Sequence, residues 1–360
     1  MCTGLPASLP LHASTTHNAI TEFITMKLVT YRTPAATSDR TGRPGALINS
    51  HVLDLGRAVP AFLAAESREL TTPFSTDSVL SMLQQWDTAE QLLPMVIDWA
   101  RSADSTAELF LRVDEVELMA PVPRPTSMRD GYAFRQHVEA ARRNRGVEMI
   151  PEFDEFPVFY FTNHQAVTGP GFVEVLERHC EKLDFELECA IVVGREGRNI
   201  KASEADEYIA GYTIMNDWSA RALQMKEMTM SLGPAKGKDF ATSIGPFLAT
   251  RDELAERRID GPNGERYDLT MVTRVNGTEV SRGNLKDMSW TFAQILERAS
   301  YGVTLYPGDV IGSGTVGTGC FLELNGSKIT DNWWLKPGDV VDCEIDLLGT
   351  LTNTLVRGAE

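Results

Sequence analysis

Two glutamates, Glu186 and Glu188, lie in the middle of the apolar stretch LDFELECAIVVG. Side chains alternate between the two faces of a β-strand, so both carboxylates are expected on one face and the apolar residues beside them on the other. Like charges that close in a poorly solvated place remain ionised only if a cation neutralises them. The pair predicts a metal site, and an exposed acidic strand face is the alternative.

A third acid, Asp217, ends the apolar run YTIMN at an expected strand-to-helix transition, where Asp is also a good helix cap. Both functions could hold together. Neither paired histidines nor thiolates accompany these carboxylates, so the expected ion is hard: Mg²⁺ first, with Mn²⁺ or Ca²⁺ as alternatives.

The segment DGYAFRQH holds a further candidate, His137, with Asp130 before it and the basic run 142–145 after it. A histidine in so polar a segment suits a general base near neutral pH. A structural or solvated histidine on a helix is the alternative interpretation.

Two glycine-rich patterns resemble nucleotide loops but lack the required context. Residues 312–317 (GSGTVG) fit the dinucleotide pattern, yet the following CFLELNG is expected to be a strand that ends in a hairpin turn, not a helix. Residues 233–238 (GPAKGK) are one residue short of a Walker A loop, and Asp239 replaces its hydroxyl residue. We therefore expect no bound nucleotide.

The overall composition is that of a globular protein, with 42% hydrophobic and 23% charged residues among 360. A formal charge of -16 argues against nucleic acid or an anionic membrane as partner. No apolar run approaches the roughly 18 residues that span a bilayer. Five scattered cysteines without a CxxC pair favour the reducing cytoplasm.

The chain is expected to divide into three parts. Residues 1–25 are rich in Ser, Thr and Pro and are expected to be a disordered extension, and 26–119 to form a small α+β domain. That domain would hold strands at 26–32 and 45–56 and helices around 78–100. A proline-rich linker, 120–125, then leads into a mainly antiparallel β domain within 120–360, with hairpin turns at Asn276-Gly277 and Asn325-Gly326.

Several motifs in this chain order resemble those of the fumarylacetoacetate hydrolase family, over most of residues 26–357. The matching motifs are Asp130-x-Tyr132-x4-His137, Glu186-x-Glu188, Asn216-Asp217-Trp-Ser-Ala-Arg221-x2-Gln224, Gly237-Lys238-x-Phe-x-Thr242, Ser313-Gly314-Thr315 and Leu322-Glu323-Leu324.

The resemblance implies an α+β, mainly β fold, with a barrel-like or β-roll catalytic domain, a small N-terminal domain and a homodimer. It also implies a metal held by Asp130, Glu186, Glu188 and Asp217, with Lys238 and Thr242 close by. His137 paired with Glu323 would activate a water, and Arg221, Gln224 and Lys238 would stabilise the charge that develops. Substrate contacts are expected from Tyr132, Tyr160, Gly314 and Thr315, and from Arg142 or Arg145.

The expected activity is hydrolysis of a carbon–carbon bond in a small 1,3-dicarbonyl acid, such as a fumarylacetoacetate- or acylpyruvate-like dioxo or dicarboxylic acid. Chemically, the His137–Glu323 pair would supply a base at neutral pH, and the metal an electron sink. One alternative is a decarboxylase or isomerase of a 2-oxo or 2-hydroxydienoic acid at the same metal. Another is a binding protein that keeps the fold without catalysis. One difference concerns substrate choice, because Met228 stands where fumarylacetoacetases carry a substrate-contacting tyrosine.

Overall fold

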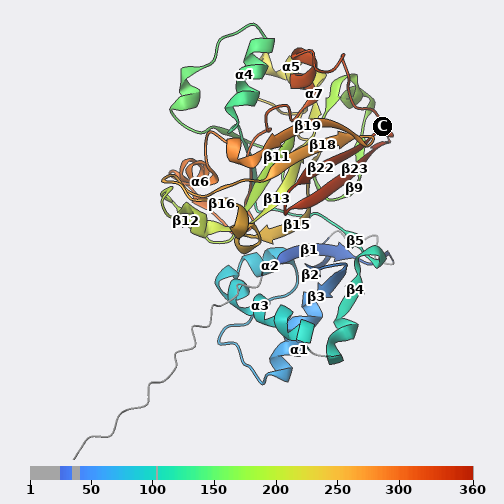
Figure 1. Cartoon of the computed structure of the whole chain (residues 1–360), viewed down its shortest axis with the longest axis vertical. Helices are drawn as coiled ribbons and strands as arrows, with labels where there is room; N and C mark the ends of the chain where they lie inside the picture. The colour runs from blue at the N-terminus through green and yellow to red at the C-terminus, as the bar shows by residue number, and fades with distance from the viewer. Residues whose placement is uncertain (1–24, 35–40, 103, 360) are drawn as a thin grey trace, which may run out of the picture.

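A computed structural model describes residues 25–34, 41–102 and 104–359. Nearly all of the extension expected at 1–25 lies outside these ranges. Figure 1 shows two lobes, the lower one built from the N-terminal part of the chain and the upper one from the rest. None of the described helices combines the length and the hydropathy needed to cross a membrane.

The lower lobe combines a small antiparallel sheet with helices. Its strands are β1 (Lys27–Arg32), β2 (Arg43–Ile48), β3 (His51–Asp54), β4 (Phe110–Arg112) and β5 (Glu117–Leu118). Its helices are α1 (Leu55–Ala65), α2 (Val79–Leu83) and α3 (Trp86–Ser102). The stretch 45–56, predicted as one strand, is a hairpin followed by the start of α1, because Asn49 adopts a left-handed turn conformation (φ 54°).

A twelve-stranded sheet runs through both lobes in the main order β4-β3-β2-β1-β15-β13-β11-β21-β6-β7, with β5 beside β1 and β8 beside β15. Its upper strands are β6 (Met128–Gly131), β7 (Phe159–Phe161), β8 (Val167–Thr168), β11 (Leu187–Val193), β13 (Ile209–Asp217), β15 (Thr242–Thr250) and β21 (Val310–Gly312). The lobes join where β1 pairs with β15, opposing Leu28 to Leu248. The lower lobe thus extends the large sheet of the upper lobe.

A second sheet of five strands packs in the upper lobe in the order β19-β18-β22-β23-β9. Its members are β9 (Gly171–Val175), β18 (Thr270–Val275), β19 (Thr278–Asn284), β22 (Val340–Ile345) and β23 (Gly349–Arg357). The hairpin predicted at Asn276-Gly277 is confirmed between β18 and β19, with positive φ at both residues. Three two-stranded ribbons complete the pairing: β10 (Leu183–Asp184) with β14 (Ser219–Ala220), β12 (Gly197–Arg198) with β20 (Thr304–Leu305), and β16 (Arg258–Ile259) with β17 (Arg266–Tyr267).

Helix and strand occupy similar shares of the described residues, 30% and 32%, so the expected mainly β composition is wrong. The helices of the upper lobe are α4 (Arg135–Asn144), α5 (Arg221–Met228), α6 (Phe292–Ser300) and α7 (Phe321–Gly326). The sheet order is open among the described strands, and no pairing between them closes it into a barrel.

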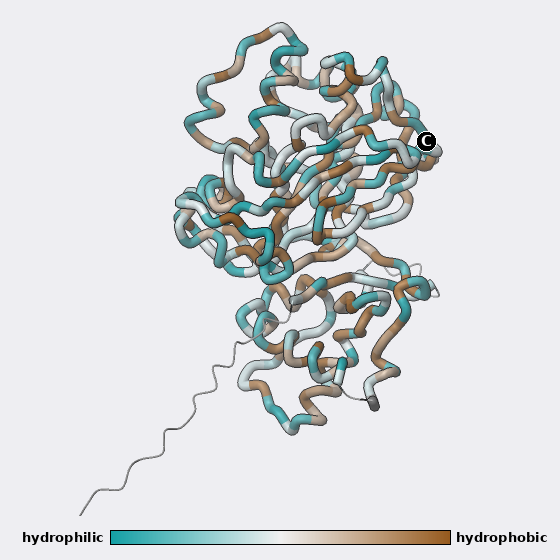
Figure 2. Tube along the Cα trace, viewed as in Figure 1, coloured by the Kyte–Doolittle hydropathy of each residue, from teal (hydrophilic) through white to brown (hydrophobic). Residues whose placement is uncertain are grey.

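The two faces of β11 enter two different hydrophobic cores. Leu187, Cys189 and Ile191 pack into the core of the upper lobe, while Ala190 and Val192 pack against the helices of the lower lobe. Hydrophobic stretches accordingly run through both lobes in Figure 2. Glu188 has the same parity as Ala190 and Val192, so its carboxylate lies at the upper end of this second face.

The segment 320–326 was predicted as a strand with a hairpin turn, and this prediction is wrong: α7 lies there. The Asp184 carboxylate accepts hydrogen bonds from the first backbone N–H groups of α7, those of Phe321 (2.7 Å) and Leu322 (2.9 Å). It thereby satisfies donors that a helix start leaves open. The same carboxylate accepts from Arg221 Nε at 2.8 Å, so one buried acid holds both the helix and the arginine.

We expect Asp184→Ala to lower the free energy of unfolding by about 3–5 kcal/mol. The substitution removes one carboxylate partner of the buried Arg221 and leaves two backbone N–H groups of α7 without an acceptor. Urea denaturation measures the change. The exposed Asp331→Ala is the control and should change stability by less than about 0.5 kcal/mol. A loss below about 1 kcal/mol in Asp184→Ala would contradict this account of α7.

Candidate active site

Four carboxylates meet at neighbouring strands of the large sheet. Asp130 comes from β6, Glu188 from β11, Asp217 from the end of β13, and Glu186 from the position just before β11. One ligand atom from each lies within 4.8 Å of the others. All four are at most 5% exposed. We call these residues the carboxylate cluster.

A glycine in the strand between β6 and β11 lets two of these acids meet. Gly312 is paired with Asp130 across β21 and β6. A Cβ at Gly312 would lie 2.6 Å from Asp130 Oδ1 and 2.8 Å from Glu188 Oε2, which is too close for any side chain. The glycine therefore gives both carboxylates access to one point.

Two buried cations neutralise one side of the carboxylate cluster. Lys238 Nζ contacts Asp217 Oδ2 at 2.6 Å and also bonds to Glu186. Arg221 Nη2 donates to Glu186 Oε1 at 2.7 Å, and its Nη1 donates to Gln224 at 2.9 Å. Burial alone would raise the pKa of Glu186, but Lys238 and Arg221 hold it below its ordinary value.

On the other side of the carboxylate cluster, Asp130 and Glu188 form no ion pair with a lysine or arginine among the described residues. Glu188 Oε2 accepts the Gly314 N–H at 3.0 Å, and Asp130 Oδ1 accepts it at 3.2 Å. Thr315 Oγ1 donates to Glu188 at 3.4 Å. Burial, and then the nearby Asp130, raise the pKa of Glu188 well above its usual range. Burial raises the pKa of Asp130 to about 7. Without a bound metal ion, Asp130 and Glu188 therefore retain a proton between them.

The carboxylate cluster fits a hard divalent cation. Asp217 Oδ1 is buried and has no hydrogen-bond partner, although Oδ2 is bonded to Lys238 and Tyr160. A buried carboxylate oxygen without a donor is a costly feature that a bound cation removes. Four oxygen donors without a thiolate suit Mg²⁺, Mn²⁺ or Ca²⁺. Thr242, expected close by, is buried and opposes Asp217 in the β13–β15 register.

A histidine–carboxylate pair lies beside the carboxylate cluster, and it joins two helices. His137, on α4, contacts Glu323, on α7, with 2.8 Å between Nδ1 and Oε2, and both side chains are buried. The Tyr132 ring packs edge-on against the imidazole, with 5.8 Å between centroids. Because Glu323 occupies Nδ1, the other ring nitrogen is the one available to a substrate.

A cavity of about 750 Å³ opens onto both groups. It brings together most of the residues expected to contact substrate, including Tyr132, Arg142, Arg145, Tyr160 and Thr315. Gly314 differs, because its N–H is directed at the carboxylates. The Arg145 side chain is exposed at the rim, where Nε donates to the Ala141 carbonyl at 3.0 Å.

The cavity also has lining residues that the sequence did not single out, among them Val158, Met225 and Trp334. Asp184 is a more informative omission. It has the same parity as Glu186 and Glu188, so the strand alternation used for those two residues also indicates Asp184. It differs in function, because its oxygens are taken up by Arg221 and α7.

Two local predictions at the site are corrected by the structure. Asp217 does not cap α5, which begins four residues later after Ala220. The glycine-rich segment 312–317 is followed by a helix and not by the expected strand. That helix is only six residues long, and Asp184 occupies its first N–H groups. The absence of a nucleotide site stays a prediction. Its reason is now that the helix is short and that Asp184 already occupies the N–H groups a phosphate would need.

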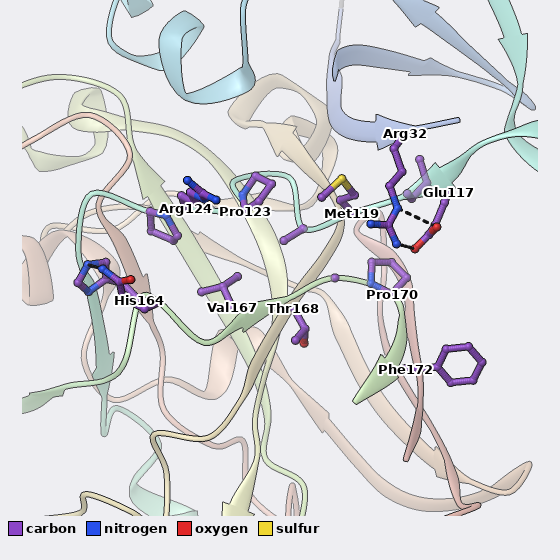
Figure 3. A pocket seen from close by; sticks show the side chains of 15 residues that line it. Arg32, Glu117, Met119, Pro123, Arg124, His164, Val167, Thr168, Pro170 and Phe172 are labelled. Atoms are coloured by element: carbon purple, nitrogen blue, oxygen red, sulfur yellow. Dashed lines mark hydrogen bonds and ion pairs between the residues drawn. The ribbon is translucent and has the colours of Figure 1, made fainter. Parts of the chain in front are cut away.

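A second cavity, also of about 750 Å³, lies where the proline-rich linker passes β8 and β9 (Figure 3). Arg32 and Glu117 form an ion pair in its wall, with 2.9 Å between Nε and Oε2. Phe172 extends to one side of it in Figure 3. None of the carboxylate cluster lines this cavity, so we place the chemistry in the first one.

Known proteins resemble this chain across the region that holds the site. The profile of the fumarylacetoacetate (FAA) hydrolase C-terminal domain matches residues 126–356, which include both the carboxylate cluster and the His137–Glu323 pair. The chain belongs to the fumarylacetoacetate hydrolase family.

Relatives within the fumarylacetoacetate hydrolase family have more than one activity in their names. Oxaloacetate tautomerase YisK of Bacillus subtilis is 32% identical over 72% of this chain and 79% of its own length. The human mitochondrial oxaloacetate tautomerase FAHD2A is 29% identical over 92% of both chains. A solved fumarylacetoacetate hydrolase from Exiguobacterium antarcticum superposes with a TM-score of 0.63 at 25% identity, over 92% of this chain and all of its own.

We expect Glu188→Gln to lose metal binding without losing the fold, because it removes a carboxylate that forms no ion pair with any described lysine or arginine. At a Mg²⁺ or Mn²⁺ concentration a hundred times Kd, the free energy of unfolding of the wild-type protein should rise by about 2.7 kcal/mol, and EDTA should reverse this rise. Thermal melting measures both effects.

The variant should melt no lower than the metal-free wild type and show no metal-dependent shift. The exposed Glu181→Gln is the matched control and should keep the full shift. A full shift in Glu188→Gln would remove this residue from the metal site.

Proposed function

We propose that this chain is a metal-dependent tautomerase that interconverts the keto and enol forms of a small 2-oxo dicarboxylic acid such as oxaloacetate. The observation that carries the proposal is the buried His137–Glu323 pair, 2.8 Å apart, beside a four-carboxylate cluster in one cavity. The names of the Bacillus subtilis and human relatives support the same reaction.

The reaction needs one proton carrier and a group that stabilises negative charge on the 2-oxo oxygen. His137 would take a proton from C3 at its free ring nitrogen and return it to the enolate oxygen, while Glu323 orients the ring and stabilises its charged form. The divalent ion would polarise the 2-oxo group as a Lewis acid. Lys238 would add positive charge, since Asp217 and Glu186 raise its pKa despite burial.

Positive charge at the rim would set the preference for a dicarboxylate. Arg145 is exposed and lies near Tyr132. Burial raises the pKa of Tyr132, and the charge of Arg145 offsets part of this increase. Arg142 lines the same cavity. Arg221 already bonds to Asp184, Glu186 and Gln224. We therefore propose that Arg221 acts as a positioning residue and that Arg142 or Arg145 meets the distal carboxylate.

Carbon–carbon bond hydrolysis is the second candidate. The free nitrogen of His137 could take its proton from a water, which would then attack a carbonyl carbon of a 2,4-dioxo acid. The hydrolase superposed above supports this possibility. The apolar Met225 and Met228 in the cavity wall would suit the acyl part of such a substrate.

The human relative is named as mitochondrial, so a cytoplasmic location stays a prediction for this chain. The homodimer stays a prediction as well.

Oxaloacetate itself distinguishes the reactions when the products are followed by NMR and mass spectrometry. Tautomerisation leaves the mass unchanged in H₂O, and in D₂O it accelerates the exchange of the C3 hydrogens for deuterium. Decarboxylation gives pyruvate and CO₂, and hydrolysis between C2 and C3 gives oxalate and acetate. We expect accelerated exchange alone. A parallel incubation with a 2,4-dioxo acid that releases pyruvate and a carboxylic acid would instead establish the second candidate.

We expect His137→Asn to lower kcat for tautomerisation by about 10²–10⁴-fold, which is the usual contribution of a general acid–base group. Stopped-flow absorbance of the enol measures the rate with saturating Mg²⁺. His164→Asn, which alters a histidine in the second cavity, is the control and should stay within about twofold of wild type. Equal rates in His137→Asn and wild type would exclude His137 as the proton carrier.

A further inference from the structure

Cys320 lies against the His137–Glu323 pair and has no part in the reaction proposed above. It is the residue before α7 and is fully buried. One ligand atom each from His137, Cys320 and Glu323 lies within 4.8 Å of the other two. A nitrogen, a sulfur and an oxygen ligand therefore converge at a point separate from the carboxylate cluster.

This donor set selects a different kind of ion from the carboxylate cluster. A thiolate and an imidazole suit Zn²⁺ and other thiophilic ions, whereas carboxylates alone suit Mg²⁺. Around a tetrahedral Zn²⁺, with Zn–N near 2.0 Å and Zn–S near 2.3 Å, ligand atoms lie roughly 3.5 Å apart. The ligand atoms of His137, Cys320 and Glu323 are therefore at most about 1.3 Å farther apart than they would be around zinc. Rotation of the side chains can close this difference.

The surroundings of Cys320 place it within reach of the cavity. His137 lines the cavity, and one of its ring nitrogens lies within 4.8 Å of the Cys320 sulfur. Burial and then Asp184 raise the pKa of the Cys320 thiol, and Arg221 lowers it by less. The thiol therefore keeps its proton when no metal is bound. Binding would exchange that proton for the ion, which gives Cys–S–Zn and one H⁺.

We propose that His137, Cys320 and Glu323 form a second metal site, which takes Zn²⁺ and thereby inhibits the enzyme. A bound ion would engage the imidazole and the carboxylate that otherwise carry the proton. The inhibition rests on the proposed function, but the binding does not. Three protein ligands leave a fourth position for water or substrate, as in many zinc sites.

The binding is tested by titrating the full chain with Cd²⁺ at saturating Mg²⁺, which keeps the carboxylate cluster occupied. Cd²⁺ reports a thiolate ligand through charge-transfer absorption in the near ultraviolet. Wild type should show a saturable band. Cys320→Ser should lose it although it retains the other four cysteines, and Cys180→Ser, the matched control with another free thiol, should keep it. Glu323→Gln should weaken the binding by at least about tenfold.

The inhibition is tested by adding Zn²⁺ to the oxaloacetate assay and taking the rate ratio with and without zinc for each variant. Saturating Zn²⁺ should slow wild type and Cys180→Ser by at least about tenfold and Cys320→Ser by less than about twofold. Melting curves confirm that each variant folds, and Cys320→Ala replaces Cys320→Ser if the latter does not.

The absence of a thiolate band in wild type, or an equal band in Cys320→Ser, would overturn the site. A band without loss of rate would overturn its inhibitory role. If oxaloacetate is not turned over at all, the Cd²⁺ titration still decides the metal site, and only the proposed function fails.

Discussion

Mutual repulsion among four buried carboxylates is the constraint on which the site depends. Two unit charges 4.8 Å apart repel by about 3.5 kcal/mol at an effective dielectric constant near 20, and the cluster holds several such pairs. Lys238 and Arg221 offset part of this repulsion on the side of Glu186. The remaining charge, on Asp130 and Glu188, would be neutralised by a shared proton or by a divalent cation.

The large sheet makes this concentration of charge possible. Its strand order places β6, β21, β11 and β13 side by side, so residues distant in the sequence reach one point from rigid elements. Gly312 provides the space between Asp130 and Glu188, because any side chain there would collide with both. The lower lobe adds strands to the same sheet and covers the face below Glu188 with helices. It therefore supports the site without contributing a carboxylate to it.

Asp184 links the carboxylate cluster to the His137–Glu323 pair. Its carboxylate holds Arg221, which bonds to Glu186, and it also holds the start of α7, which carries Glu323. One buried residue thus positions a partner of the carboxylate cluster and a partner of His137. Such fixed placement by rigid elements favours catalysis, because the groups need little reorganisation when substrate binds.

Features that depend on local periodicity and turn chemistry could be predicted from the sequence alone. Strand alternation predicts Glu186 and Glu188 on one face, and Asn276-Gly277 predicts a hairpin, since both patterns act over a few neighbouring residues. The helix at 321–326 could not be predicted in this way, because the carboxylate that caps it comes from Asp184, 137 positions before Phe321. The sheet shared by the two lobes, the engagement of Arg221 and the position of Cys320 beside His137 likewise depend on long-range packing, which no local pattern records.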